Sequence, residues 1–207
     1  MTIQDAYDRW SITYDSDRNR TRDLDGEVTR KVLGKMRFER ILEIGCGTGK
    51  NTAFLSGIST SVLALDFSEK MLKKAKQKKF AGEVTFARAD ITQPWQIAQN
   101  MFDLISCNLV LEHIEDLTFI FSEAARVLKA PGYFFISELH PFRQYQGTQA
   151  NFKNTQETVV IPAFVHHISE FLGAAIHAGF TLIDLQEWWH EEDAGKPPRL
   201  LTLLFDK

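Results

Sequence analysis

The feature that most constrains the fold is the glycine-rich turn "GCGTG" at residues 45–49, directly after the apolar run "RILEI". Glycine lacks a Cβ atom, so alternate glycines let the chain turn tightly and bring backbone N–H groups against a ligand. The residues from Lys50 onward favour a helix. A strand, a glycine turn and a helix in this order predict a parallel sheet with a nucleotide-like ligand at the turn.

Strands and amphipathic helices alternate along the rest of the chain. The predicted strands cover residues 38–44, 61–66, 83–90, 101–108, 131–139, 181–189 and 199–207. The predicted helices cover 25–36 after an Asp25 cap, a segment from Lys50, the lysine-rich segment after a Ser68 cap, 114–129 and 168–180. This alternation predicts an α/β fold: a doubly wound, Rossmann-like, mostly parallel seven-stranded sheet with helices on both faces. Because no helix separates the last two strands, we expect the last strand to run antiparallel.

The chain of 207 residues is predicted to form one domain. Residues 1–36 are interpreted as an N-terminal cap. The polar run 140–162 shows no helical period, so we expect a lid or insertion over 140–166. No apolar run reaches the ~20 residues of a membrane span, and nothing resembles a secretory signal, so a cytoplasmic protein is expected.

Charge and cysteine content exclude several classes of site. The net charge is −3 and the isoelectric point about 6.1, whereas proteins that bind duplex nucleic acid usually present a basic face. Cys46 and Cys107 are too few for a disulfide framework and are interpreted as buried thiols. We expect no metal site and no membrane contact, and the sequence carries no strong signal for a nucleic-acid partner.

The glycine spacing discriminates between cofactors. A dinucleotide fingerprint reads G-x-G-x-x-G, but Lys50 stands at the place of the third glycine. A P-loop needs G-x-x-x-x-G-K-[ST], and Ile44 stands where its first glycine belongs. Asp66 ends the second predicted strand 21 positions after Gly45, where a carboxylate accepts hydrogen bonds from ribose hydroxyls. The pattern therefore favours a nucleoside without a pyrophosphate.

These residues give the chain a detailed resemblance to the class I S-adenosylmethionine-dependent methyltransferases. The resemblance rests on "ILEIGCGTGKNT", "LALDFSEKMLKKAK", "ARADITQPW" and "FDLISCNLVLEHIED", and it covers about residues 38–136. The N-terminal segment "YDRWSITYDSD" is similar to that of the methyltransferases related to ubiquinone and menaquinone biosynthesis enzymes. The chain beyond residue 137 matches the family much more weakly.

The resemblance implies a cofactor site for S-adenosyl-L-methionine, with S-adenosyl-L-homocysteine as product. Gly45, Cys46 and Gly47 would approach the methionine portion, and Glu43 would lie beside its positively charged end. Asp66 would hold the ribose and Phe67 would lie against the adenine. Asp90 would accept from the adenine amino group, with Ile91 beside it, and Asn108 would offer its backbone carbonyl to the ammonium group.

The acceptor and the catalytic residues are less defined. His140, His113 and Tyr14 are the candidate catalytic residues because each is predicted to reach the carboxyl edge of the sheet. One of Arg18, Arg20 and Arg22 is a candidate to pair with the cofactor carboxylate or an acidic substrate, although solvated surface charges are an alternative. Methyl transfer is dominated by alignment of the reacting atoms, so it needs no universal base.

We expect methylation of a small organic molecule by a monomer or homodimer. O-methylation is favoured, and C- or N-methylation remains open. An RNA or protein methyltransferase is an alternative within the family. Outside it, a nicotinamide-dependent oxidoreductase is disfavoured by Lys50 and by the missing Tyr-x-x-x-Lys pair. A non-catalytic nucleoside-binding module is the third possibility.

Overall fold

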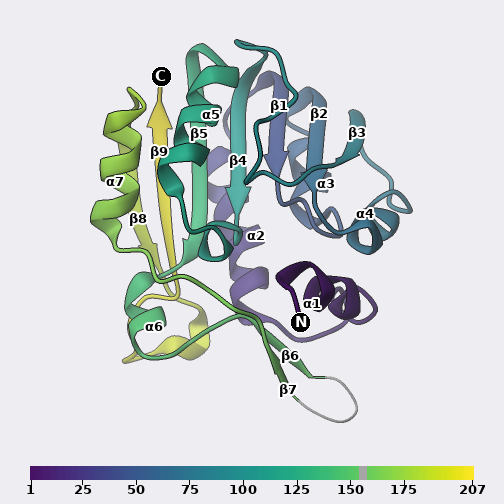
Figure 1. Ribbon diagram of the computed structural model, residues 1–207, viewed down its shortest axis with the longest axis vertical. Coiled ribbons are helices and arrows are strands. Elements are labelled where there is room, and N and C mark those ends of the chain that lie inside the picture. The colour runs from purple at the N-terminus through teal and green to yellow at the C-terminus, as the bar shows by residue number, and fades with distance from the viewer. Residues whose placement is uncertain (154–157) are drawn as a thin grey trace.

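The computed structural model describes residues 1–153 and 158–207. One seven-stranded sheet dominates this part of the chain (Figure 1). Its strands, in the order β3-β2-β1-β4-β5-β9-β8, are β3 (Glu83–Arg88), β2 (Ser59–Asp66), β1 (Phe38–Ile44), β4 (Phe102–Asn108), β5 (Leu128–Leu139), β9 (Leu200–Asp206) and β8 (Thr181–Trp188). The last strand, β9, pairs antiparallel with both β5 and β8, and the other pairs are parallel. The predicted doubly wound sheet is confirmed.

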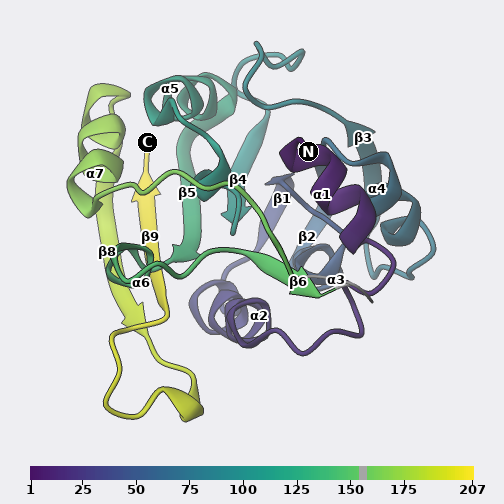
Figure 2. The same ribbon diagram turned by 60° about the horizontal axis from the view of Figure 1, so that its bottom comes forward.

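Helices cover both faces of the sheet (Figure 2). They are α1 (Ile3–Trp10), α2 (Arg20–Leu33), α3 (Lys50–Leu55), α4 (Glu69–Ala75), α5 (Leu117–Val127), α6 (Pro141–Tyr145) and α7 (Ile168–His177), with 3₁₀ turns η1 (Leu111–His113) and η2 (Glu191–Asp193). Within the described residues, no helix combines the length and the apolar character needed to cross a membrane.

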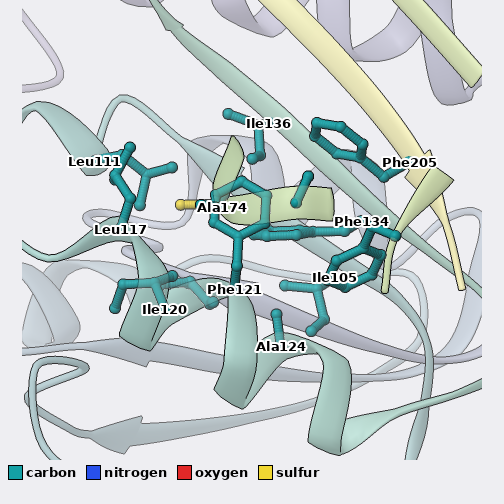
Figure 3. Close-up of a cluster of buried hydrophobic side chains, with 14 of the residues drawn as sticks. Ile105, Leu111, Leu117, Ile120, Phe121, Ala124, Phe134, Ile136, Ala174 and Phe205 are labelled. Carbon is teal, nitrogen blue, oxygen red and sulfur yellow. The ribbon is translucent and has the colours of Figure 1, made fainter. Parts of the chain in front are cut away.

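Side chains along the central strands point alternately to the two faces of the sheet, and a separate hydrophobic core lies on each face. In β1, Leu42 and Ile44 pack on the side of α5 and α7, whereas Ile41 packs with residues of α2, α3 and α4. Phe121 of α5 lies among side chains of β5 and β9 in the first core (Figure 3), with its ring 5.2 Å from that of Phe134. A sheet buried on both faces holds the carboxyl ends of β1–β5 in fixed positions at one edge.

One helix start differs from its prediction. Helix α2 begins at Arg20, and its N-cap is Asn19, whose side chain accepts a hydrogen bond from the Arg22 N–H. The interpretation of Asp25 as the cap is wrong, because Asn19 provides the same type of cap six residues earlier. Asp25 is instead 3% exposed on the inner face of α2. The Ser68 cap of α4 is confirmed, since Ser68 Oγ accepts from the Met71 N–H at 3.1 Å.

The predicted lid contains regular structure rather than loop alone. It includes α6 and a two-stranded hairpin of β6 (Asn151–Lys153) and β7 (Thr158–Val160), while residues 154–157 of this prediction lie outside the described residues. Helix α1, which was not predicted, packs against this hairpin. The Trp10 ring stacks on the Phe152 ring at 5.4 Å. Helix α1 and the hairpin therefore form one roof at the carboxyl edge of the sheet (Figure 1).

Candidate active site

A cavity of about 350 Å³ lies at the carboxyl edge, beneath α1, and we call it the strand-end cavity. Four strands deliver residues to it: Gly45 follows β1, Asp66 ends β2, Asp90 follows β3 and Asn108 ends β4. The predicted site residues that line it are Tyr14, Gly45, Gly47, Asp66, Phe67, Asp90, Ile91, Asn108 and His113. The structure therefore brings most of the predicted residues together.

The glycine turn forms one wall of the strand-end cavity. Gly45 has a φ of +69°, and a Cβ atom added there would lie 2.1 Å from Val110 Cγ2. Gly47 has a φ of +53°, and a Cβ added there would meet nothing within 4 Å. Both positions need the left-handed backbone that glycine adopts readily. The turn keeps its backbone close to the cavity because no side chain intervenes.

Asp66 joins the turn to the next helix. Its Oδ2 accepts a hydrogen bond from the Gly47 N–H, and its Oδ1 accepts one from the Ser68 N–H, both at 2.8 Å. Burial raises the pKa of Asp66 to about 6, against the effect of these two backbone hydrogen bonds. The carboxyl group is therefore largely ionised at pH 7 while it is held rigidly at the cavity wall.

The far wall of the strand-end cavity combines a carboxylate with apolar side chains. Asp90 is exposed, and its Oδ1 accepts from the N–H and the hydroxyl of Thr92. Ile91 is 9% exposed beside it. The Phe67 ring lies edge-on to Tyr7, with 6.0 Å between the ring centroids. This arrangement offers a flat apolar surface next to a hydrogen-bond acceptor.

Two predicted cofactor residues do not line the strand-end cavity. Glu43 is 3% exposed beneath the turn, and its Oε2 accepts a hydrogen bond from the Thr52 hydroxyl. Burial raises the pKa of Glu43 to about 8, so the group is largely uncharged at pH 7. Cys46 packs its side chain into the core beside α2, α3 and α4. The structure therefore places both residues where they support the turn, and Cys46 and Cys107 are free, buried thiols.

Asp25 is a central residue that the sequence analysis misread. Its Oδ1 accepts from Asn108 Nδ2 and its Oδ2 from Asn51 Nδ2, each at 2.8 Å. Asn108 Nδ2 also donates to the Thr29 hydroxyl, and Asn108 Oδ1 accepts from Ser106. Asp25 thus links α2 to β4 and α3. The signal available in the sequence was the position of Asp25 three residues before Val28, on the apolar side of the helix predicted over 25–36.

Tyr7 and His113 form a pair that only partly followed from the sequence. His113 Nδ1 lies 2.9 Å from the carbonyl oxygen of Pro162, which can only accept, so Nδ1 carries a proton. Burial lowers the pKa of His113, so the ring is neutral and Nε2 accepts the hydroxyl proton of Tyr7 at 2.8 Å. Tyr7 was not singled out, although it begins the quoted N-terminal motif. The pair joins the roof to η1.

His140 occupies a different place from the one expected. Its Nδ1 accepts from the Phe142 N–H at 3.1 Å, which caps α6, and its Nε2 lies 2.8 Å from Glu187 Oε1. The ring lines neither the strand-end cavity nor the second cavity described next. The structure thus separates the two candidate histidines.

A second cavity of about 390 Å³ adjoins the first, and we call it the arginine cavity. Tyr7, Tyr14 and Leu109 line both cavities. Its charged lining residues are Arg18, Arg20, Arg22, Arg199 and Glu112. Leu109 has a φ of +56°, a strained conformation for a residue with a side chain, and it stands at the boundary. The two cavities therefore meet along a short common wall.

The charges of the strand-end cavity indicate the kind of ligand that it fits. Asp66 and Asp90 place two carboxyl groups on its wall, and none of its described lining residues is Lys or Arg. A diphosphate in this cavity would find no cation to balance it. A nucleoside with a net positive group fits both the charge and the size, since ligand cavities measure about 300–1,000 Å³. The described residues contain no cluster of His, Cys, Asp and Glu suited to a metal ion.

Comparisons with known proteins agree with this geometry. Residues 42–136 match the family described as "Methyltransferase domain". The chain is 28% identical over 172 residues to the malonyl-[acyl-carrier protein] O-methyltransferase of Bacillus cytotoxicus, covering 79% of this chain and 58% of the relative. It is 25% identical over 112 residues to the ubiquinone biosynthesis O-methyltransferase of Nitrosomonas europaea, covering 53% of this chain and 48% of the relative. The chain thus spans about half the length of these curated relatives.

A solved structure shares the fold. The S-adenosylmethionine-dependent methyltransferase from Mesorhizobium loti superposes with a TM-score of 0.73 at 22% identity, covering 87% of this chain and 96% of that chain. At this identity the likeness establishes the architecture, and it agrees with the strand order described above.

Proposed function

Because the chain belongs to the class I S-adenosylmethionine-dependent methyltransferases, we propose that it transfers a methyl group from this cofactor to a small organic acceptor. The observation that carries the proposal is the charge of the strand-end cavity. Its wall holds the Asp66 carboxylate at a strand end, and its described lining residues include no cation. A phosphate-free nucleoside with a positive sulfonium is suited to such a wall.

Different residues of the strand-end cavity would then bind different parts of the cofactor. We assign the ribose to Asp66, the adenine to Phe67, Asp90 and Ile91, and the methionine portion to the wall formed by Gly45 and Gly47. Asn108 lines the cavity with its side chain held by Asp25, so it would act through its backbone. Glu43 supports the turn from below and makes no direct contact in this assignment.

The cofactor, when bound, supplies a methyl group already activated by its sulfonium. The protein's task is to align the acceptor with it, and alignment alone can supply about 7–11 kcal/mol of the barrier. The arginine cavity is the proposed acceptor site, because it meets the strand-end cavity at Tyr7, Tyr14 and Leu109. The acceptor atom would therefore meet the methyl group beside these three residues.

Tyr7 and His113 provide a route for the acceptor's proton. Tyr7 lines both cavities and its hydroxyl donates to His113 Nε2, so it would take a proton from the acceptor while it passes its own to His113. A general base of this kind contributes roughly 10²–10⁴-fold in rate. His140 would instead position α6. Proton removal suits a hydroxyl acceptor, and the two curated relatives are O-methyltransferases, so O-methylation is our first choice.

Ligand binding by the purified protein tests this function. Titration calorimetry with S-adenosylhomocysteine should show one site per chain, and NAD at the same concentration should give no heat of binding. Mass spectrometry of small molecules released on denaturation gives an independent readout. Binding of NAD without S-adenosylhomocysteine would support an oxidoreductase and contradict the proposal.

A further inference from the structure

The arginine cavity carries more positive charge than its own carboxyl groups balance. Four arginines line it, at positions 18, 20, 22 and 199, and Glu112 is the one carboxyl residue among its described lining residues. The partners of these arginines are themselves shared between two cations. Arg18 and Arg20 both pair with Glu192, Arg199 and Arg143 with Asp193, and Arg22 and Lys50 with Asp23. Of the nearby carboxylates, Asp17 binds Trp10 and Thr13 instead.

Three of these arginines, Arg18, Arg20 and Arg199, keep N–H groups for a ligand, but the Arg18 side chain is 74% exposed and is not held in place for one. Arg20 donates to Glu192 through Nη2. Arg199 donates to Asp193 through Nε and Nη2, each at 2.7 Å, and to the Thr21 hydroxyl through Nη1. A guanidinium has five N–H donors, so both side chains retain some. Arg22 differs, because it also donates to the carbonyl oxygens of Tyr14 and Asp17 and so holds the N-terminal segment together.

Arg199 is oriented before any ligand arrives. Its partner Asp193 is fully buried and also pairs with Arg143 at 3.0 Å, so the guanidinium is fixed in a doubly bonded geometry. These two arginines hold the pKa of Asp193 far below its usual value. A fixed guanidinium matches the two oxygens of a carboxylate or phosphonate and costs little ordering when the ligand binds.

Glu112 supplies a second, independent indication of a polar ligand. It is 6% exposed, lines the arginine cavity, and its Oε2 has no hydrogen-bond partner among the described residues. A buried polar atom without a partner destabilises the protein, so a ligand group that bonds to it would recover that loss. Burial raises the pKa of Glu112 to about 7, so the carboxyl can donate as well as accept near neutral pH.

We propose that the methyl acceptor is an organic acid whose anionic group lies against Arg20 and Arg199. The atom that receives the methyl group would lie where Tyr7, Tyr14 and Leu109 line both cavities. That atom forms the new bond to the methyl carbon, the sulfur–carbon bond breaks with its electron pair on sulfur, and the acceptor's proton leaves to Tyr7. This inference rests on the proposed methyltransferase function and names its substrate class.

A matched panel of small molecules tests the substrate class. Protein saturated with S-adenosylhomocysteine is mixed with hydroxybenzoates, aliphatic hydroxy acids and phosphonates, and with the primary amides of the same carboxylic acids. The melting temperature should rise with acids of at least one series and not with the amides. With S-adenosylmethionine present, the same acids should release S-adenosylhomocysteine at least 10-fold faster than their amides.

Arginine variants test the place where the acid binds. Arg20→Gln should raise KM for an active acid about 10-fold or more with a smaller change in kcat, and Arg20→Lys should recover part of the loss. Lys35→Gln removes an exposed positive charge just after α2, close to the start of β1, and should leave KM unchanged. The affinity for S-adenosylhomocysteine should be the same in all four proteins.

Three results would overturn the inference. Amides that bind or react as well as the acids would remove the charge requirement, and so would a panel in which no acid shifts the melting temperature. A loss of S-adenosylhomocysteine affinity in Arg20→Gln would assign the arginine to the cofactor carboxylate. Failure of the parent protein to bind S-adenosylhomocysteine at all would instead count against the methyltransferase function itself.

Discussion

At the scale of single residues, Asp66 combines two tasks. Its two oxygens hold the N–H groups of Gly47 and Ser68, and its charge faces the strand-end cavity. Asp66→Asn removes the charge and keeps only one of the two acceptor oxygens, so one of the two backbone N–H groups faces the Asn Nδ2 instead. Hydrogen bonds to a charged group contribute about 1.5–3 kcal/mol, so the S-adenosylhomocysteine affinity should fall about 10-fold to 150-fold. Calorimetry measures it, and unchanged affinity in a folded variant would contradict the ribose assignment.

The two histidines offer a second comparison at this scale. His113→Gln should lower kcat by about 100-fold or more once an acceptor is known, because in the proposed route His113 receives the proton through Tyr7. His140→Gln should lower kcat less than 3-fold, because His140 caps α6 and contacts Glu187 away from both cavities. Steady-state kinetics with S-adenosylhomocysteine detection measure both. Equal losses in the two variants would argue against the Tyr7–His113 route.

At the scale of elements, the roof formed by α1 and the β6–β7 hairpin covers the cavities at the carboxyl edge of the sheet. It is held by the stack of Trp10 on Phe152, which is 6% exposed. Phe152→Ala removes this contact, and buried Phe→Ala changes cost about 3–5 kcal/mol. Because the roof has few contacts with the sheet, we expect Phe152→Ala to let α1 and the hairpin separate locally while the sheet stays folded.

Hydrogen exchange by mass spectrometry checks this expectation. Phe152→Ala should speed exchange at residues 3–10, 151–153 and 158–161 while the central strands keep their protection. Val160→Ala is the matched control, since Val160 lies on the same hairpin with 54% of its surface exposed. Faster exchange throughout the sheet would show that the roof is instead part of the global folding unit.

Elements with strong local signals were predictable from the sequence. The predicted strand 38–44 has the observed bounds of β1, because a short apolar run ends abruptly at the glycine turn. Helix α1 was missed although its inward-packing residues, Ile3, Ala6, Tyr7 and Trp10, recur at i, i+3, i+4 and i+7, because residues 1–36 were interpreted only as a cap. An isolated helix of eight residues is marginal in water, so its periodicity alone does not show that it forms without the distant hairpin that packs on it.

The same distinction between local signals and distant contacts applies to the candidate active site. Residues at strand ends, such as Asp66 and Asp90, were predictable because parallel strands must deliver them to one edge. Contacts between distant segments were not, and the cases are Asp25 with Asn108 and Tyr7 with His113. The same limit explains His140, whose place after β5 was predicted but whose side chain turns toward Glu187. Where a side chain turns depends on neighbours that sequence order does not reveal.

At the scale of the whole molecule, buried carboxyl groups set the dependence of stability on pH. Burial raises the pKa of Glu43 and Glu138 to about 8 and that of Glu112 to about 7, from an ordinary value of 4.5. Between pH 4.5 and 8 the folded state therefore holds protons that the unfolded state releases, so stability falls as the pH rises. The melting temperature should be higher at pH 6.5 than at pH 8.

Glu138→Gln isolates one of these groups. Glu138 Oε1 accepts from the N–H groups of Val110 and Leu111, and a glutamine oxygen can keep both bonds. In this variant the free energy of unfolding should fall less steeply with pH, by up to about 1.4 kcal/mol per pH unit. Denaturant titrations at pH 6.5, 7.25 and 8 measure it. A slope equal to that of the parent protein would show that Glu138 ionises normally in the folded state.

The common wall of the two cavities has a consequence for inhibitor design. Since Tyr7, Tyr14 and Leu109 line both cavities, one compound joining an adenosine unit to an acid through a short thioether or amine tether should occupy both at once. Because the two halves are linked, the compound would lose its translational and rotational entropy only once on binding. Such a conjugate should bind more tightly than either half, and the tether length that binds best would measure the path along which the methyl group travels.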